Sequence, residues 1–406
     1  MKRSLPLTTR SMITFSLIGL IYLLLAGCNS SAQPEVSETQ EAAPPTEEMV
    51  TGSGFDRHAL LVNMTDNVIV PLLKDFEDQA AALEDAAHQF QADPTEANLE
   101  TVQQAWQQAA MGWNRLVFFE LGSFRNANGD LVSFMEIYNK IDKWPTNVDF
   151  IESLIADQET IDEPLIDSIG STTKGLPAIE YLIFNPAGNA QLVSTFTDGP
   201  TGSKRMQYLV AATENLNNKA KELLDIWAAE GDNYAGVFIN AEADGGDPQA
   251  SISLLVNQMA ASLEDIVKRK IGHPLGKTSQ AGVRPELVEA ELSGISGELL
   301  HSNFEGFATV FNGGSEAGQQ PGFDDYLDYV GAEYEGQPLS KVINDQIKTT
   351  QAALEAIDEP LHQAMENQPD QVELVYNEAR KLIVLIKADM ANHLAVTMTF
   401  NDSDGD

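Results

Sequence analysis

Apolar residues recur at three- and four-residue steps through most of this chain, and this period is the feature that most constrains its fold. Each such set covers one face of a helix. Similar stripes fall within residues 209–227, 252–267, 287–311 and 342–357. The sequence therefore predicts an all-α protein. The two longest stripes are Leu99, Val102, Trp106, Ala109, Trp113, Leu116 and Val117, and Val372, Val375, Ala379, Leu382, Ile386 and Met390.

Local signals refine this prediction. The order Asp93, Pro94, Thr95, Glu96 predicts a helix that begins at Pro94 with Asp93 as its N-cap. Strand-like alternation occurs only in residues 396–400 (VTMTF), so β structure is expected to be minor. Long helices joined by Gly- and Pro-rich loops are typical of four-helix bundles. A division near residues 230–246 predicts two bundles, over residues 55–235 and 236–406.

The first 54 residues have a different composition. A basic start, an apolar run and the ending Leu25-Ala26-Gly27-Cys28 predict a secretory signal peptide over residues 1–27. The LAGC ending resembles the lipobox of bacterial lipoproteins, which implies cleavage before Cys28 and lipidation of its thiol. Residues 28–54 are rich in Ser, Pro and Glu, and they predict a flexible acidic tether. We expect attachment to a membrane through the lipid on Cys28, and Asn29 favours the outer membrane by resemblance to known lipoproteins.

The excess of acidic residues limits the kinds of partner that the protein can bind. The chain has 24 Lys and Arg against 61 Asp and Glu, a formal net charge of −37. Such a surface repels phosphate backbones, so no nucleic-acid partner is expected.

One carboxylate stands out in the segment GLPAIEYLIF, residues 175–184. Leu176, Ile179 and Ile183 share a helix face, and Glu180 falls beside them rather than opposite them. A carboxylate on a buried face costs several kcal/mol unless it is paired, protonated or bound to a cation. Two interpretations stay open: Glu180 binds a ligand or metal, or it is a structural ion-pair partner of Arg115.

Four segments resemble the imelysin-like family in their usual order. They are AWQQAAMGWNRLVFFELG, DKWPTNVDFIESLI, GLPAIEYLIF and LAVTMTFNDSDGD. The resemblance implies two related four-helix bundles, a location in the bacterial cell envelope, a site between the bundles and a role in iron uptake. It also carries the family's older classification as metallopeptidases.

The chain departs from the family's hallmark, G-x-H-x-x-E, at one position. Gly175 and Glu180 match it, but Pro177 stands where the histidine is expected. Proline has no side-chain donor or acceptor and cannot ligate a metal. The sequence also lacks the H-E-x-x-H motif of zinc peptidases. Peptidase activity is therefore disfavoured but kept as the alternative.

Three further patterns are candidate metal sites. Glu298 and His301 form a Glu-x-x-His pair, and Glu359 and His362 form another, as in di-iron bundles. Because Glu is frequent here, solvated helix faces are the simpler interpretation. The final residues, NDSDGD, resemble the start of a calcium loop but end before its twelfth position.

These inferences combine into one hypothesis. The protein is expected to be a non-enzymatic lipoprotein of iron uptake that binds iron, an iron chelate or an iron-uptake protein between its bundles, with iron as the expected metal. The ligand-binding residues expected are Gly175, Glu180, Arg115, Trp113 and Trp144, and the metal candidates are Glu180, Glu298 and His301. Beside the peptidase, an acidic scaffold or adhesin is the other alternative.

Overall fold

The computed structural model describes residues 54–241, 245–278, 282–314 and 320–399. Residues 53–406 group into one compact unit. The signal peptide, Cys28, nearly all of the tether and the whole NDSDGD segment lie outside the described residues. Among the helices described, none is long and apolar enough to cross a membrane.

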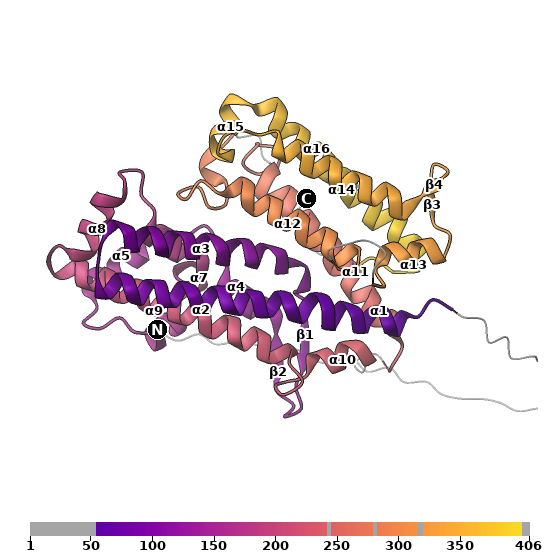
Figure 1. The fold of residues 1–406 in the computed structure, drawn as a ribbon, viewed down its shortest axis with the longest axis horizontal. Coiled ribbons are helices and arrows are strands. Elements are labelled where there is room, and N and C mark those ends of the chain that lie inside the picture. Colours follow the sequence, from indigo (N-terminus) through magenta and orange to yellow (C-terminus); the bar gives the residue numbers. More distant parts are fainter. Residues whose placement is uncertain (1–53, 242–244, 279–281, 315–319, 400–406) are drawn as a thin grey trace, which may run out of the picture. The chain divides into compact units, whose positions relative to one another are not determined.

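The first half of the chain contains the longest helices, which lie side by side in Figure 1. α2 packs along both α3 and α9, and shorter helices cover them. The elements are α1 (Arg57–Asn63), η1 (Met64–Ile69), α2 (Val70–Ala92), α3 (Glu96–Leu116), η2 (Val117–Phe119), β1 (Ser123–Arg125), β2 (Leu131–Ser133), α4 (Phe134–Ile141), α5 (Val148–Asp157), α6 (Glu163–Ser168), η3 (Ser171–Thr173), α7 (Gly175–Ile183), α8 (Asn189–Thr197), α9 (Gly199–Trp227) and α10 (Tyr234–Asn240).

The helices of the second half are somewhat shorter. α14 packs on α16, and α12 contacts both α14 and α3 of the first half. The elements are α11 (Pro248–Asp265), η5 (Ile266–Gly272), η6 (Pro285–Leu287), α12 (Ser296–Phe311), α13 (Phe323–Tyr329), β3 (Glu333–Tyr334), β4 (Gln337–Pro338), α14 (Leu339–Glu355), α15 (Leu361–Asn367), α16 (Pro369–Val384), η7 (Leu385–Met390) and α17 (Ala391–His393).

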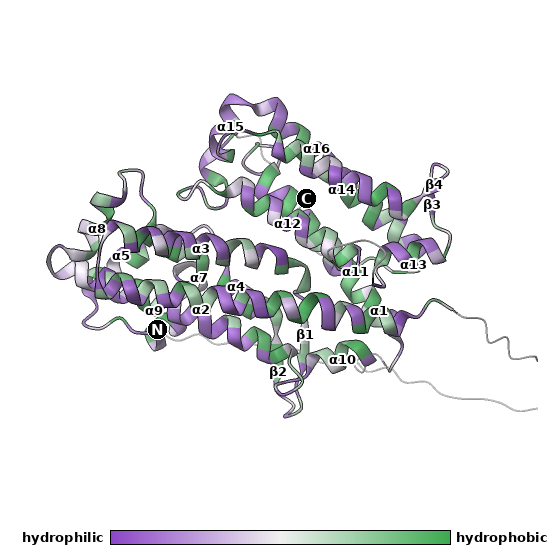
Figure 2. Ribbon diagram, viewed as in Figure 1, coloured by the Kyte–Doolittle hydropathy of each residue, from purple (hydrophilic) through white to green (hydrophobic). Residues whose placement is uncertain are grey.

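The apolar stripes are the buried faces of these helices. Of the stripe on α3, all members except Val117 are buried, and the whole stripe on α16 and η7 is buried. Figure 2 shows hydrophobic and hydrophilic residues mixed along most helices, as expected for helices with one buried face. Strand structure is limited to two antiparallel hairpins, β1–β2 and β3–β4. The prediction of an all-α fold with minor β structure is confirmed, whereas the division into bundles over residues 55–235 and 236–406 stays a prediction.

Three local predictions are wrong. The helix expected at Pro94 begins at Glu96 as α3, because the side chain of Thr95, not that of Asp93, accepts the backbone N–H of Asn98. The stripe that starts at residue 287 becomes α-helical only at Ser296, and turns occupy residues 288–294. Residues 396–399 form no strand, since no partner strand pairs with them in the part of the chain that the structure describes.

Two features bring the halves close together. A Cβ on Gly306 of α12 would lie 2.6 Å from the backbone oxygen of Arg115 in α3, so the absence of a side chain permits this helix contact. η5 continues α11 as a π-helix, a form often found at functional sites. η5 carries Arg269 and Lys270, which shape the site described next.

Candidate functional site

A cavity of about 440 Å³ lies beside Glu180, and its walls come from both halves of the chain. α3, α7 and the segment between α4 and α5 form one side; η5, residues 286–292 and α12 form the other. The lining is largely apolar, with several ionisable groups among the apolar side chains. These groups are Asp142, Glu180, Tyr181, Arg269, His273, Glu286, Glu289 and Glu291.

Glu180 is buried in the cavity wall, with only 7% of its surface exposed. Its Oε1 accepts the backbone N–H of Ser293 at 2.8 Å. Burial raises the pKa of Glu180 to about 7; the bonds to Ser293 oppose the rise, while Glu289 and Glu291 add to it. Arg115 is not its partner, because Arg115 binds Glu305 at 3.0 Å. The expected Arg115–Glu180 ion pair is therefore absent, and a backbone donor takes its place.

The raised pKa of Glu180 gives a testable pH dependence. Its pKa rises from the usual 4.5 to about 7 on folding, so the folded state takes up the proton first as the pH falls. Stability should therefore increase between about pH 7 and pH 4.5, by on the order of 3 kcal/mol from this group. Glu180→Gln should remove this part of the pH dependence. Urea unfolding of both proteins at pH 8 and pH 5 measures the difference, and parallel profiles would contradict the burial of an ionisable Glu180.

Trp144 and Arg269 form another part of the cavity wall. The Arg269 guanidinium lies 4.6 Å from the centre of the Trp144 ring, within range of a cation–π interaction. Asp265 binds the same guanidinium through Nε and Nη2 at 2.9 to 3.0 Å. Two contacts thus fix the orientation of Arg269, and Trp144 lies at the cavity, as the sequence predicted it could line a pocket.

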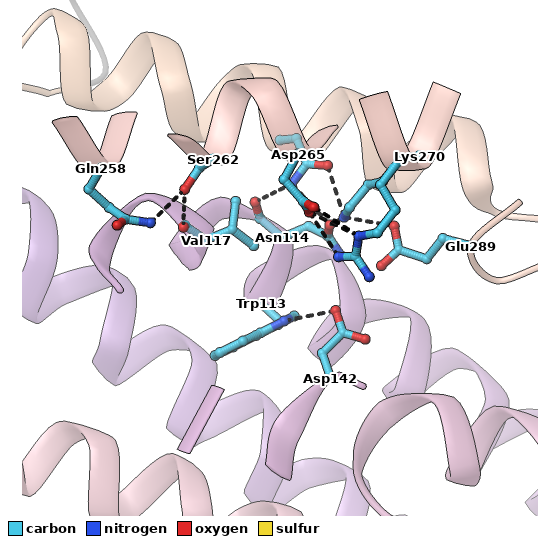
Figure 3. Close-up of polar contacts among 11 residues, drawn as sticks. Trp113, Asn114, Val117, Asp142, Gln258, Ser262, Asp265, Lys270 and Glu289 are labelled. Carbon is cyan, nitrogen blue, oxygen red and sulfur yellow. Dashed lines mark hydrogen bonds and ion pairs between the residues drawn. The ribbon is translucent and has the colours of Figure 1, made fainter. Parts of the chain in front are cut away.

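A buried polar cluster joins the halves (Figure 3), and two of its members, Asn114 and Glu289, line the cavity. Lys270 is 4% exposed, and its Nζ lies 2.7 Å from Oε2 of Glu289, which is 8% exposed. The same ammonium group donates to Asn114 Oδ1 at 2.6 Å and to Asn303 Oδ1 at 3.2 Å. Asn303 in turn donates to Asn114, to its backbone oxygen at 2.7 Å. One cation therefore satisfies acceptors from α3, α12 and the segment after η6.

Trp113 and Asp142 form a further polar contact near this cluster. The Trp113 indole donates to Asp142 Oδ2 at 3.0 Å, as Figure 3 shows. Burial and the nearby charge of Glu289 raise the pKa of Asp142, while Lys270, Arg269 and the Trp113 bond oppose the rise. Trp113 itself packs between Phe76 and Tyr138. It does not line the 440 Å³ cavity, but it holds a carboxylate that does.

Gly175 and Pro177 set the start and position of α7. Gly175 adopts φ +70°, and a Cβ there would lie 2.1 Å from the backbone oxygen of Ile141. Pro177 lies in the first turn of α7, where its missing N–H costs nothing. Its ring lines the cavity near Glu180. The hallmark segment thus starts a helix against the end of α4 and points its carboxylate into the cavity.

The other metal candidates lie elsewhere. Glu298 and His301 line a second cavity of about 420 Å³ together with Glu355 and Glu359. His301 contacts Glu305 through Nδ1 and Glu355 through Nε2, each at 3.4 Å. Within the described ranges, no group of three His, Cys, Asp or Glu side chains could hold a metal ion. The di-iron arrangement is therefore not assembled there, and the metal roles of Glu180, Glu298 and His301 stay predictions.

Sequence reasoning missed several residues of this site. Lys270 occupies a face with the buried Ile266, Val267 and Ile271, the same kind of misfit that identified Glu180. That signal could have been found. Arg269, Asp142 and Glu289 carry no comparable signal, because their positions depend on how α4, η5 and the turns after η6 meet in space.

The fold and the cavity define an all-α protein with buried carboxylates between its two halves. Comparison with known proteins identifies its family: the sequence profile of the imelysin family (Peptidase_M75) matches residues 69–387, so the chain belongs to this family. It is 26% identical over 313 residues to "Iron-regulated protein A" of Synechococcus elongatus, covering 75% of this chain and 78% of that protein.

Two solved structures share the fold. One is the "putative iron-regulated protein A precursor" of Parabacteroides distasonis; its TM-score is 0.68 at 18% identity, over 83% of this chain and 95% of that one. The other is an imelysin-like protein from Psychrobacter arcticum, with a TM-score of 0.65 at 15% identity, over 85% of this chain and 97% of that one. The resemblance inferred from the four segments is confirmed.

Proposed function

We propose that this protein is a cell-envelope lipoprotein of iron uptake, anchored through Cys28, and that its 440 Å³ cavity binds a small iron chelate. The observation that carries the proposal is the cavity itself, with Glu180 buried in its wall. A volume of roughly 300 to 1,000 Å³ is usual for sites of small organic ligands. The name of the relative from Synechococcus elongatus, "Iron-regulated protein A", supports the connection with iron.

The lining favours a chelate over a bare ion. Iron prefers oxygen and nitrogen ligands in a defined geometry, and no group of three such side chains is assembled in the described residues. A chelate brings its own oxygen ligands, so the protein needs only apolar contacts and a few hydrogen bonds. Carboxylates outnumber cations in the lining, which favours a neutral or cationic chelate over an anionic one.

The residues that line the cavity also argue against the peptidase alternative. A metallopeptidase needs about three protein ligands for its metal, and Pro177 supplies none. The residues that line the cavity therefore do not fit a catalytic zinc, and no hydrolytic step can be assigned to them. Binding is the activity that this arrangement supports.

The proposal is tested by titrating the purified protein with three probes: ferric acetohydroxamate, which is neutral, ferric citrate, which is anionic, and ferrous sulfate. We expect the neutral chelate to bind with one-to-one stoichiometry, and Glu180→Gln to weaken it about tenfold by removing a charged hydrogen-bond acceptor. Glu298→Gln, in the second cavity, is the matched control and should bind as the wild type does. Equal affinity of the Glu180 and Glu298 variants for the neutral chelate would overturn the proposal. So would a protein that binds only the ferrous ion and loses it only in Glu298→Gln.

A further inference from the structure

One turn-rich segment, residues 288–295, borders two cavities. Its first part, Val288 to Leu292, lines the 440 Å³ cavity beside Glu180. Gly294 lines the 420 Å³ cavity that contains Glu298 and His301. The 288–295 segment is therefore a shared wall, and a movement of it would change both cavities.

Buried contacts hold the beginning of the segment. Glu289 makes the ion pair with Lys270 at 2.7 Å, and both side chains are almost fully buried. The hydroxyl of Ser296, the first residue of α12, donates to the backbone oxygen of Glu289. Because these contacts lie inside the protein, this end is fixed.

The less buried part of the segment, residues 291–294, has one hydrogen bond to α7. The backbone N–H of Ser293 donates to Glu180 Oε1 at 2.8 Å, across 113 residues of sequence. The other bonds near this point are local: Ser293 Oγ and Gly294 N each donate to the backbone oxygen of Ala290 at 3.1 Å. Because both partners of these bonds lie within the segment, the bonds are kept when the segment moves and do not hold it against α7.

The backbone of the segment is suited to movement. Ala290 and Gly294 both adopt a left-handed conformation, with φ +54° and +76°. A non-glycine residue at such an angle stores strain that its surroundings must offset. Leu292, between them, is 37% exposed although it lines the cavity. Residues 291–294 are exposed or half-buried turns, whereas Val288, Ala290 and Ile295 on either side are buried and anchor the two ends. Turns of this kind open at lower free energy than helices do.

We propose that the 288–295 segment is a lid over the Glu180 cavity, and that Glu180 is its latch. This inference rests on the proposed function, since the lid matters only if the cavity takes a ligand. The carboxylate accepts the Ser293 N–H when the cavity is empty, and a donor on the chelate competes for the same oxygens when it is full. Ligand entry is thereby coupled to release of the lid. Because Gly294 lines the second cavity, release of the lid also changes the shape of that cavity.

Amide hydrogen exchange of the ligand-free protein, followed by mass spectrometry, tests the latch. Glu180→Ala removes the acceptor, and Ser293→Pro removes the donor while keeping Glu180. Both should speed exchange in residues 288–295 by about tenfold, the effect of losing one hydrogen bond to a charged group. Glu180→Gln keeps an acceptor oxygen and should exchange at a rate between those of the wild type and the alanine variant.

The controls separate a loosened lid from a damaged fold. Glu291→Gln changes a carboxylate of the same segment that is not the latch, and its exchange should match the wild type. Peptides from α2 and α9 should be unaffected in every variant. The latch proposal would be overturned if Glu180→Ala left the exchange of residues 288–295 unchanged. It would also be overturned if Glu291→Gln accelerated that exchange as much as Glu180→Ala does. The exchange experiment uses no ligand, so its result does not depend on the proposed function. If the lid loosened as expected but the protein bound none of the three iron probes, only the proposed function would be refuted.

Discussion

Replacing Lys270 by Met is expected to destabilise the protein by about 3 to 5 kcal/mol, the range for breaking one side of a buried ion pair. The loss would leave the Glu289 carboxylate, 8% exposed, without its cation at 2.7 Å. It would also remove a donor shared by Asn114 and Asn303, which hold α3 and α12 together. Urea unfolding at pH 7 measures the change in the free energy of unfolding.

Two further proteins decide whether the buried pair is the cause. Lys341→Met removes an exposed cation that pairs with Asp345, so it should change stability by less than about 1 kcal/mol. The double variant Lys270→Met with Glu289→Leu removes both buried charges and should recover much of the loss. If the double variant were at least as unstable as Lys270→Met alone, the ion pair would not be the origin of the effect.

The apolar period predicted most helices because burial of one helix face is a local property of the sequence. Leu99, Trp106 and Trp113 repeat at the helical spacing, and all three are buried in α3. The same logic showed that Glu180 would be buried, since it falls on the apolar face of α7. It fails where the apolar period continues but the helix does not: residues 288–294 carry apolar side chains yet form turns. Those turns line the cavity, so the error falls at the candidate site.

The partners of the buried charges could not be predicted in the same way. Spacing shows that Glu180 needs a partner, but its partner is the backbone N–H of Ser293, and every residue except proline has such a group. Arg115 was the obvious cation on a neighbouring helix, yet it faces Glu305 on α12. Which helices meet is decided by packing across the whole chain. A sequence can thus indicate that a charged residue is buried more reliably than it can indicate which group neutralises the charge.

The mutation Gly175→Ala should be among the most damaging single changes in the hallmark segment, with a loss of roughly 3 kcal/mol or more from strain and overlap combined. Gly175 has φ +70°, and its Cβ position lies 2.1 Å from the oxygen of Ile141 and 2.7 Å from that of Lys140. Since both are backbone atoms, α4 or α7 has to shift. That shift would displace Glu180, so affinity for the neutral chelate should fall together with stability.

Gly331→Ala separates the two causes. Gly331 has a similar angle, φ +65°, but no atom lies within 4 Å of its Cβ position. It should therefore lose only the cost of the left-handed conformation, about 1 to 2 kcal/mol, and keep the wild-type affinity for the chelate. Unfolding and binding measured on both variants distinguish a strained backbone from a displaced helix. Equal losses of stability would mean that α7 does not depend on its close approach to Ile141, and the role assigned to Gly175 in placing Glu180 would be wrong.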